Sequence, residues 1–225
     1  MIPSLHANST WRVLAIAAAL VASAVVGHAQ MAYQVWVDTH SLIANPAAPF
    51  SLDFQLNDGS GFGDSNNWAT ISNIQFGGGS VFGSATTTGN ATGSLGSSVA
   101  LTDTDPLLNE FYQGFTPGSW LSFKVTLSTN VDSSVTPDVF SFSVLDSNLF
   151  NLPTTSFGTD TFLEVNIDSA TPTIATYASA DGSIPAPLAT AVPEASTYGL
   201  CAGGLAIMVV IVRRRRSLQQ VPRAS

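Results

Sequence analysis

The chain has 225 residues, which is room for one domain of ordinary size and for separate segments at both ends. Its net charge of −8 hides a segregation of charge, because residues 30–192 contain one base, Lys124, and fourteen of the fifteen acids. Such an acidic body is repelled by nucleic acid and by anionic membrane surfaces, so no nucleic-acid partner is expected. The only cysteine is Cys201, so no intramolecular disulfide can stabilise the fold.

Residues 1–29 have the pattern of a secretory signal peptide. Arg12 precedes an uninterrupted, mostly apolar stretch at residues 13–26, and the small residues Gly27 and Ala29 follow at the −3 and −1 positions of a cleavage site. The pattern predicts cleavage between Ala29 and Gln30. An uncleaved N-terminal anchor is the alternative, but this apolar stretch is short for a membrane span.

Residues 30–183 are expected to form the body, in which short segments alternate between apolar and polar residues and are separated by turn-forming residues. Half-buried strands need a second layer to cover their apolar side, so we expect an all-β fold: an antiparallel β-sandwich with a jelly-roll-like arrangement. The clearest predicted strands are residues 50–56, 121–127, 140–144 and 163–167. Weaker candidates are residues 33–38, 72–76, 99–102 and 173–178.

The segment of residues 58–67 is rich in side-chain oxygens and glycines. Calcium favours such loops, and Asp58, Ser60 and Asp64 are the candidate ligands, although the spacing is not that of an EF-hand. The alternative is an ordinary turn between two strands. No other cofactor is expected. The same two interpretations apply to Asp103 and Asp105.

Residues for catalysis are scarce in the body, and we predict that the protein is not an enzyme. His40 is its only histidine and has no nucleophile motif nearby, so we expect it in a surface turn. A glycan-active enzyme with paired carboxylates is an alternative. Its candidates are Asp53, Glu110 and Glu164, but their spacing along the chain selects no pair.

Five aromatic residues of the body suggest a second alternative, a surface carbohydrate-binding module. Aromatic side chains on a sheet can form a platform on which sugar rings stack. The same residues can instead fill a core or a strand edge, and we expect the core for most of them. They are Trp36, Trp68, Trp120, Tyr33 and Tyr112.

The C-terminal region has three parts in a fixed order. Residues 184–196 are rich in proline and alanine and predict an extended linker, and residues 197–212 are uncharged and predict a transmembrane helix. Residues 213–225 form a basic tail, whose arginines are expected to stay in the cytoplasm while the body lies outside. The stop-transfer residues are Arg213, Arg214, Arg215 and Arg216.

A short motif precedes this apolar segment. It consists of Val192, Pro193, Glu194, Ala195, Ser196 and Thr197. Motif, span and arginine cluster together resemble the PEP-CTERM sorting signals of Gram-negative bacteria that make exopolysaccharide, with Ala195 where that family usually has proline. The resemblance implies processing at this site by a membrane enzyme of the exosortase type.

The body shows a second resemblance. Residues 111–116, 121–127, 140–146 and 152–154 look like a recurring ectodomain type among PEP-CTERM proteins. This resemblance implies a location and no particular activity. We therefore expect an exported protein, anchored in the membrane through its C-terminus with the body outside, which reaches the cell surface or the medium after processing. The expected role is structural and non-catalytic, with exopolysaccharide as a partner.

Overall fold

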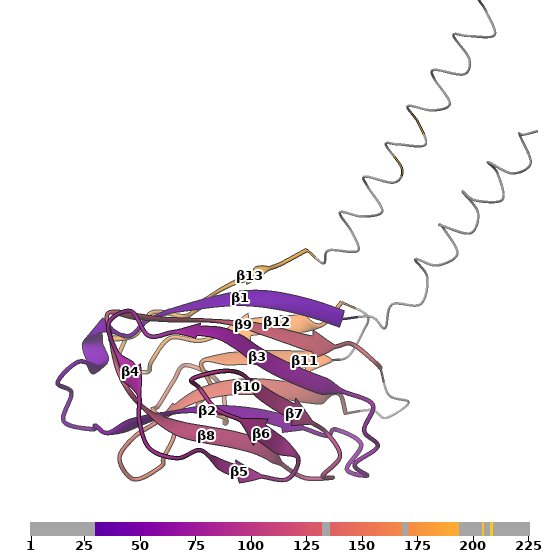
Figure 1. Cartoon of the computed structure of the whole chain (residues 1–225), viewed down its shortest axis with the longest axis horizontal. Coiled ribbons are helices and arrows are strands. Elements are labelled where there is room, and N and C mark those ends of the chain that lie inside the picture. The colour runs from indigo at the N-terminus through magenta and orange to yellow at the C-terminus, as the bar shows by residue number, and fades with distance from the viewer. Residues whose placement is uncertain (1–29, 132–135, 168–170, 194–203, 205–207, 209–225) are drawn as a thin grey trace, which may run out of the picture. The chain divides into compact units, whose positions relative to one another are not determined.

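The computed structural model describes residues 30–131, 136–167, 171–193, 204 and 208 (Figure 1). The predicted signal peptide and basic tail lie outside these residues, as does most of the predicted transmembrane segment. Within the described part of the chain, no helix is long and apolar enough to cross a membrane.

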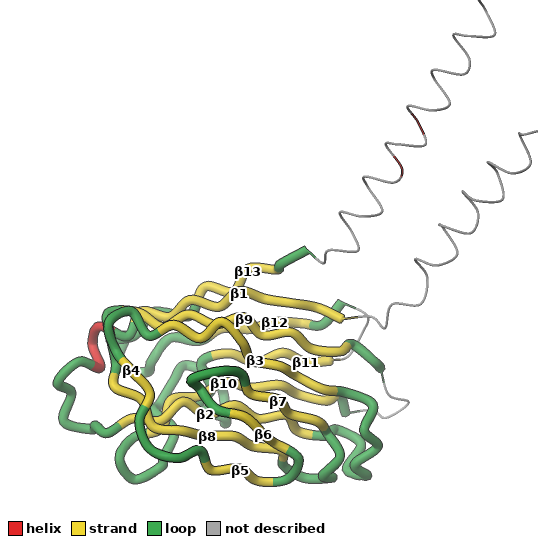
Figure 2. Tube along the Cα trace, viewed as in Figure 1, coloured by secondary structure: helices red, strands yellow, loops and turns green. Residues whose placement is uncertain are grey.

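Two antiparallel sheets make up the body, which is all-β and sandwich-like (Figure 2). The six-stranded sheet has the order β13 (Leu188–Ala191), β1 (Gln30–Asp38), β9 (Trp120–Ser128), β3 (Trp68–Gln75), β7 (Val99–Thr102) and β6 (Ala91–Gly93). The seven-stranded sheet has the order β12 (Thr173–Thr176), β11 (Leu163–Ile167), β10 (Asp138–Leu145), β2 (Phe50–Asn57), β8 (Asn109–Thr116) and β4 (Ser80–Val81), with β5 (Thr86–Thr88) also paired to β8.

The alternating segments predicted from the sequence are strands in the structure. In β2 the four apolar residues at positions 50, 52, 54 and 56 are fully buried, and in β9 the apolar residues at 121, 123, 125 and 127 are buried in the same way. Polar residues stand between them because successive side chains point to opposite faces of a sheet. The antiparallel all-β prediction is therefore confirmed.

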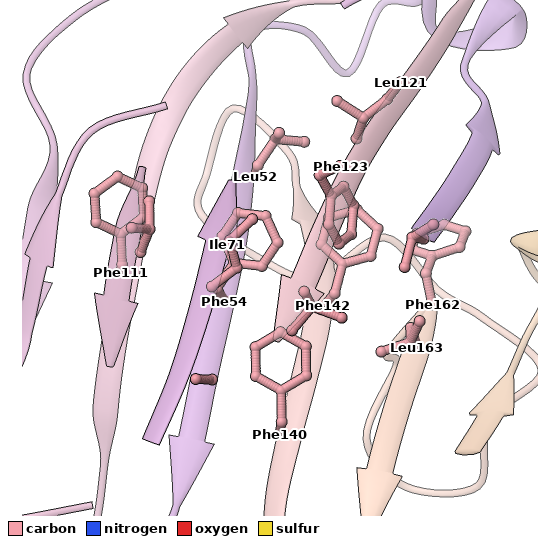
Figure 3. Packing of buried hydrophobic residues seen from close by; sticks show 14 of the residues in the cluster. Leu52, Phe54, Ile71, Phe111, Leu121, Phe123, Phe140, Phe142, Phe162 and Leu163 are labelled. Carbon is pink, nitrogen blue, oxygen red and sulfur yellow. The ribbon is translucent and has the colours of Figure 1, made fainter. Parts of the chain in front are cut away.

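Phenylalanines fill the centre of the core between the sheets (Figure 3). The ring of Phe142 on β10 lies 5.3 Å from that of Phe54 on β2 and 5.1 Å from that of Phe123 on β9. Phe123 also meets Phe54 edge-on at 5.3 Å, so residues of both sheets form one cluster. Edge-to-face and offset pairs of this kind add stability beyond their buried area.

The body extends further toward the C-terminus than the sequence suggested. Ile184 is buried, and β13 pairs with β1 with Tyr33 opposite Ala191. The backbone N–H of Val192 then donates to the carbonyl of Ala32 at 2.7 Å. The described part of the predicted linker therefore belongs largely to the sheet. Prolines at 185 and 187 obscure this in the sequence, because they precede a short edge strand without an alternating pattern.

Candidate functional site

Several polar loops meet at one end of the two sheets. Asn57 at the end of β2 lies opposite Val139 near the start of β10, and Leu56 lies opposite Asn109 at the start of β8. The loop after β2 therefore approaches the loops that precede β8 and β10. This loop contains the segment of residues 58–67.

Asp58 organises this loop through its carboxylate. Its Oδ1 accepts hydrogen bonds from the backbone of Ser60 at 2.7 Å, from the Ser60 hydroxyl at 2.6 Å and from Gly61 at 3.0 Å. Its Oδ2 accepts from the backbone of Gly63. Partial burial acts to raise the pKa of Asp58, but these bonds outweigh it and lower the pKa below its usual range. Asp58 is thus a turn anchor that stays ionised.

The other two candidate calcium ligands are bonded within the same loop. Ser60 donates to Asp58, and the carboxylate of Asp64 accepts from the backbone of Asn66 at 3.2 Å and from its side-chain amide at 3.3 Å. Among the residues that the structure describes, no group of three or more His, Cys, Asp or Glu could hold a metal ion. The calcium site remains a prediction, and the turn geometry is what the structure shows.

Behind this loop lies a buried network centred on Asn67. Its backbone N–H donates to Asp103 at 2.8 Å, and its Nδ2 donates to Asp138 at 2.7 Å and to the carbonyl of Asn130 at 2.8 Å. Its Oδ1 accepts from the hydroxyl of Ser128 at 2.8 Å and from the backbone of Asn130 at 3.1 Å. Asn67 thereby connects strands of both sheets.

Two carboxylates share this network. Asp103 is fully buried and Asp138 is 2% exposed, and Oδ1 of Asp103 has no hydrogen-bond partner. Burial raises the pKa of Asp103 to about 7 against the bond from Asn67, and the charge of Asp138 adds to the rise. Asp105, by contrast, accepts from the backbone of Leu107 at 3.1 Å in an exposed turn. Asp103 is therefore part of the buried network, whereas Asp105 stabilises an exposed turn.

The structure brings two of the three candidate catalytic carboxylates together, on the outer side of the seven-stranded sheet. Nε2 of Gln55 donates to Asp53 at 2.8 Å and to Glu110 at 3.1 Å. Glu164 lies in the same row but two strands away from Gln55, beyond Ser141. Burial, and next the charge of Glu110, raise the pKa of Asp53 to about 7.

This pair lacks the access that glycoside hydrolysis requires. Because both carboxylates bond the same nitrogen, their bonded oxygens can be no further apart than the sum of the two bond lengths, a limit that permits the roughly 5–5.5 Å of retaining glycosidases. However, Asp53 is only 1% exposed, so it cannot reach a glycosidic oxygen as a general acid must. The hydrogen bond from Gln55 to the buried carboxyl of Asp53 therefore contributes to the structure of the sheet.

The remaining candidates are placed on surfaces or in the core. His40 is exposed, begins the 3₁₀ turn His40–Leu42 and donates its backbone N–H to Asp38 at 3.0 Å. Tyr33 is 4% exposed and belongs to the core. Tyr112 is half-buried on β8, opposite Asp53.

The expectation that most of the aromatic set fills the core is wrong for the three tryptophans. Trp36 is 42% exposed, and Trp68 and Trp120 are half-buried. Each is adjacent along its strand to a buried apolar residue, so alternation turns it outward. That signal was present in the sequence, but the size of indole suggested burial.

Of the predicted sorting and processing residues, only Gln30, Val192 and Pro193 lie within the described part of the chain. Gln30 is the first residue of β1, and Val192 bonds to the same strand. Ala29 and the rest of the motif, residues 194–197, lie outside it, as do the four arginines. Comparison with protein-family models, with curated proteins and with solved structures finds no match.

Proposed function

We propose that this chain is an exported, non-catalytic surface protein whose β body is delivered by an N-terminal signal peptide and sorted through a C-terminal signal of the PEP-CTERM type. Its role is structural, in the layer of polysaccharide outside the cell. The inaccessibility of Asp53 and Asp103 supports a non-catalytic body, because acids with pKa values near 7 would otherwise suit general acid–base chemistry.

One observation in particular supports the sorting proposal. The body starts at Gln30 on β1 and ends beside Val192, and these two points lie on neighbouring strands. The proposed signal peptide, before it is cleaved, and the proposed sorting signal would therefore both be attached to the body at one edge of the six-stranded sheet. This arrangement suits a domain that is processed twice at a membrane surface.

A jelly-roll topology is part of the same proposal. The neighbouring strands β1, β9, β3 and β7 in one sheet, facing β2, β8 and β4 in the other, follow the alternation between sheets that jelly rolls have. β10, β11 and β12 then extend the second sheet beyond β2, and β13 extends the first beyond β1.

A reporter fusion tests the sorting proposal. Because residues 184–191 belong to the body, the fusion should carry residues 192–225 behind an exported reporter. We expect it to be processed in a host that has an exosortase and retained at full length in a host that lacks one. Pro193→Ala and Glu194→Ala should block processing, whereas Ala195→Pro should increase it. A fusion that stays full-length and membrane-bound in both hosts contradicts the proposal.

A further inference from the structure

The three tryptophans of the body share one surface, the outer side of the six-stranded sheet. Trp36 lies on β1, Trp120 on β9 and Trp68 on β3, in strands that are neighbours in this sheet. Their side chains are on the side opposite the core, as the alternation of buried residues shows. We define the open face by Trp36, Trp120, Trp68, Lys124, Gln34 and Ser72.

Lys124, the only base of the body, lies at the centre of this open face. It is directly opposite Gln34 on β1 and Ser72 on β3, and no carboxylate of the described residues pairs with it. Trp120 lies four residues from Lys124 in one direction along β9, which is about 13 Å. Ser128 lies at the same distance in the other direction, and its hydroxyl accepts a hydrogen bond from the backbone of Trp68 at 2.8 Å.

The open face therefore has aromatic ends and a polar centre. Trp36 faces Ser122, and Trp120 is two residues further along β9, so these two indoles are diagonal neighbours at one end. Trp68 lies at the other end, about 25 Å along the strand direction. Between them are small hydroxyl side chains such as Thr126 and Thr70, which pair across the strands.

The indole ring of Trp120 packs against the backbone of Gly77. A Cβ at Gly77, whose φ is +56°, would lie 2.8 Å from two atoms of the indole ring, so the ring packs directly on this backbone. A fixed ring loses little side-chain freedom when a ligand stacks on it, which favours binding. Nothing in the packing of the core requires an indole at these outward positions.

The charge distribution indicates a neutral ligand. Apart from Lys124 and Asp38 at one corner, the strand residues of the open face are uncharged, while Asp53, Glu110 and Glu164 lie on the other sheet. A polyanion would be repelled by the acidic body as a whole. A chain of neutral sugars offers apolar C–H faces for the indoles and hydroxyls for Lys124, Gln34 and the serine and threonine hydroxyls.

We propose that the open face binds a neutral polysaccharide, with the pyranose rings stacked on Trp36, Trp120 and Trp68 and with Lys124 donating hydrogen bonds to sugar oxygens at the centre. The proposal deepens the proposed function, since it rests on a location where such polymers occur. It specifies the site and the ligand class, and it can fail while the sorting proposal stands.

Affinity electrophoresis of the full-length chain in mild detergent tests the proposal. The gels contain a soluble β-glucan or a glucomannan as neutral polymers, or alginate as the acidic one. We expect retardation by a neutral polymer and none by alginate. Trp36→Ala and Trp120→Ala should each weaken binding by about tenfold or more, and Lys124→Gln by about threefold to tenfold.

Two control variants remove aromatic rings elsewhere. Phe157→Ala removes a fully exposed ring in a loop, and Tyr112→Ala removes one on the other sheet. Both should bind as the unchanged protein does. Thermal unfolding of every variant shows whether a loss of binding reflects a loss of folding, and Trp36→Tyr should restore much of the affinity if stacking is the cause.

Three results would overturn the proposal: no retardation by any neutral polymer, retardation by alginate alone, or equal retardation of the folded variants Trp36→Ala, Trp120→Ala and Lys124→Gln. Self-association that Trp36→Ala abolishes, without polymer binding, would assign the open face to a second copy instead. The reporter fusion is measured separately, so a failure of glycan binding and a failure of sorting can be told apart.

Discussion

Asp53 and Glu110, on neighbouring strands of the seven-stranded sheet, accept hydrogen bonds from the same atom, Nε2 of Gln55. One amide nitrogen thus stands between two carboxyl groups, one of which is 1% exposed. Burial of Asp53, and next the negative charge of the half-buried Glu110, disfavour an ionised Asp53, so the arrangement favours its protonated form. Its pKa of about 7 expresses that preference and makes the stability of the body depend on pH.

Stability is expected to fall as the pH rises from about 4 to 7. In that range an unfolded Asp53 has lost its proton while the folded one retains it, so unfolding releases a proton and becomes easier at higher pH. Asp53→Asn removes the share of this dependence that Asp53 contributes and should stabilise the protein at pH 8 by roughly 2–4 kcal/mol relative to its effect at pH 4. Urea unfolding at both pH values measures the difference.

Glu164→Gln is the control for this experiment, because it neutralises a carboxylate on the same side of the same sheet. It measures how much of the change results from removing any one negative charge on this side of the sheet. Asp103 also has a raised pKa, so part of the dependence should persist in Asp53→Asn. Equal pH profiles for Asp53→Asn and the unchanged protein would show that Asp53 is ionised in the fold.

Asn67→Ala should destabilise the body by about 2–4 kcal/mol. The substitution removes the amide that serves Asp138, Ser128 and Asn130, and it leaves buried groups without partners. Asn148→Ala is the matched control, because Asn148 bonds only to Asp146 on an exposed loop. Urea unfolding of both variants measures the effect, and a loss below about 1 kcal/mol for Asn67→Ala would contradict the role of the network.

The sequence predicted the strands better than it predicted these networks. Alternation located β2, β9 and β10 because each places bulky apolar residues at every second position. It missed β8, where the buried positions 109 and 113 are Asn and Gln, and the first four residues of β3, where the inward residue Ala69 is small. It also missed the short strands β4, β5, β6 and β13, which have little apolar pattern. Local periodicity reports on burial only when the buried residue is large.

The network around Asn67 had no local signal at all. Asn67 and Asp103 are 36 positions apart in the chain, and Asn67 and Asp138 are 71 apart. The pairing of β3 with β7, in which Trp68 lies opposite Thr102, brings Asn67 to Asp103, and the packing of one sheet on the other brings it to Asp138 on β10. For the open face, the alternation around Trp36 and Trp120 was visible in the sequence. The part of β3 that contains Trp68 was not predicted, and neither was the strand order that aligns the three tryptophans.

Phe142→Ala tests the central core. Phe142 is fully buried and contacts Phe54, Phe123 and Phe162, with ring centres 5.3, 5.1 and 6.4 Å away. The cavity left by its removal should cost about 3–5 kcal/mol in the free energy of unfolding. Phe157→Ala, at a fully exposed position, should change stability by less than about 0.5 kcal/mol. Similar losses for both would mean that the two sheets do not pack through Phe142.

Removal of β13 should weaken the edge of the six-stranded sheet. A chain that starts at Gln30 and ends at residue 187 lacks the four residue pairs between β13 and β1 and the bond from Val192 to Ala32. It also exposes the backbone edge of β1, which invites pairing with other chains. Compared with a chain that ends at residue 193, we expect a loss of about 1–3 kcal/mol and faster aggregation.

Urea unfolding and light scattering measure these two effects. Leu188→Ala in the longer chain is the control, because it shortens a side chain that is 65% exposed and leaves the strand in place. If the chain ending at 187 unfolds at the same urea concentration and stays monomeric, β13 is a dispensable extension. If it behaves as expected, the proposed sorting signal would begin directly after a structural strand, and an enzyme that cuts beyond Pro193 would leave the sheet complete.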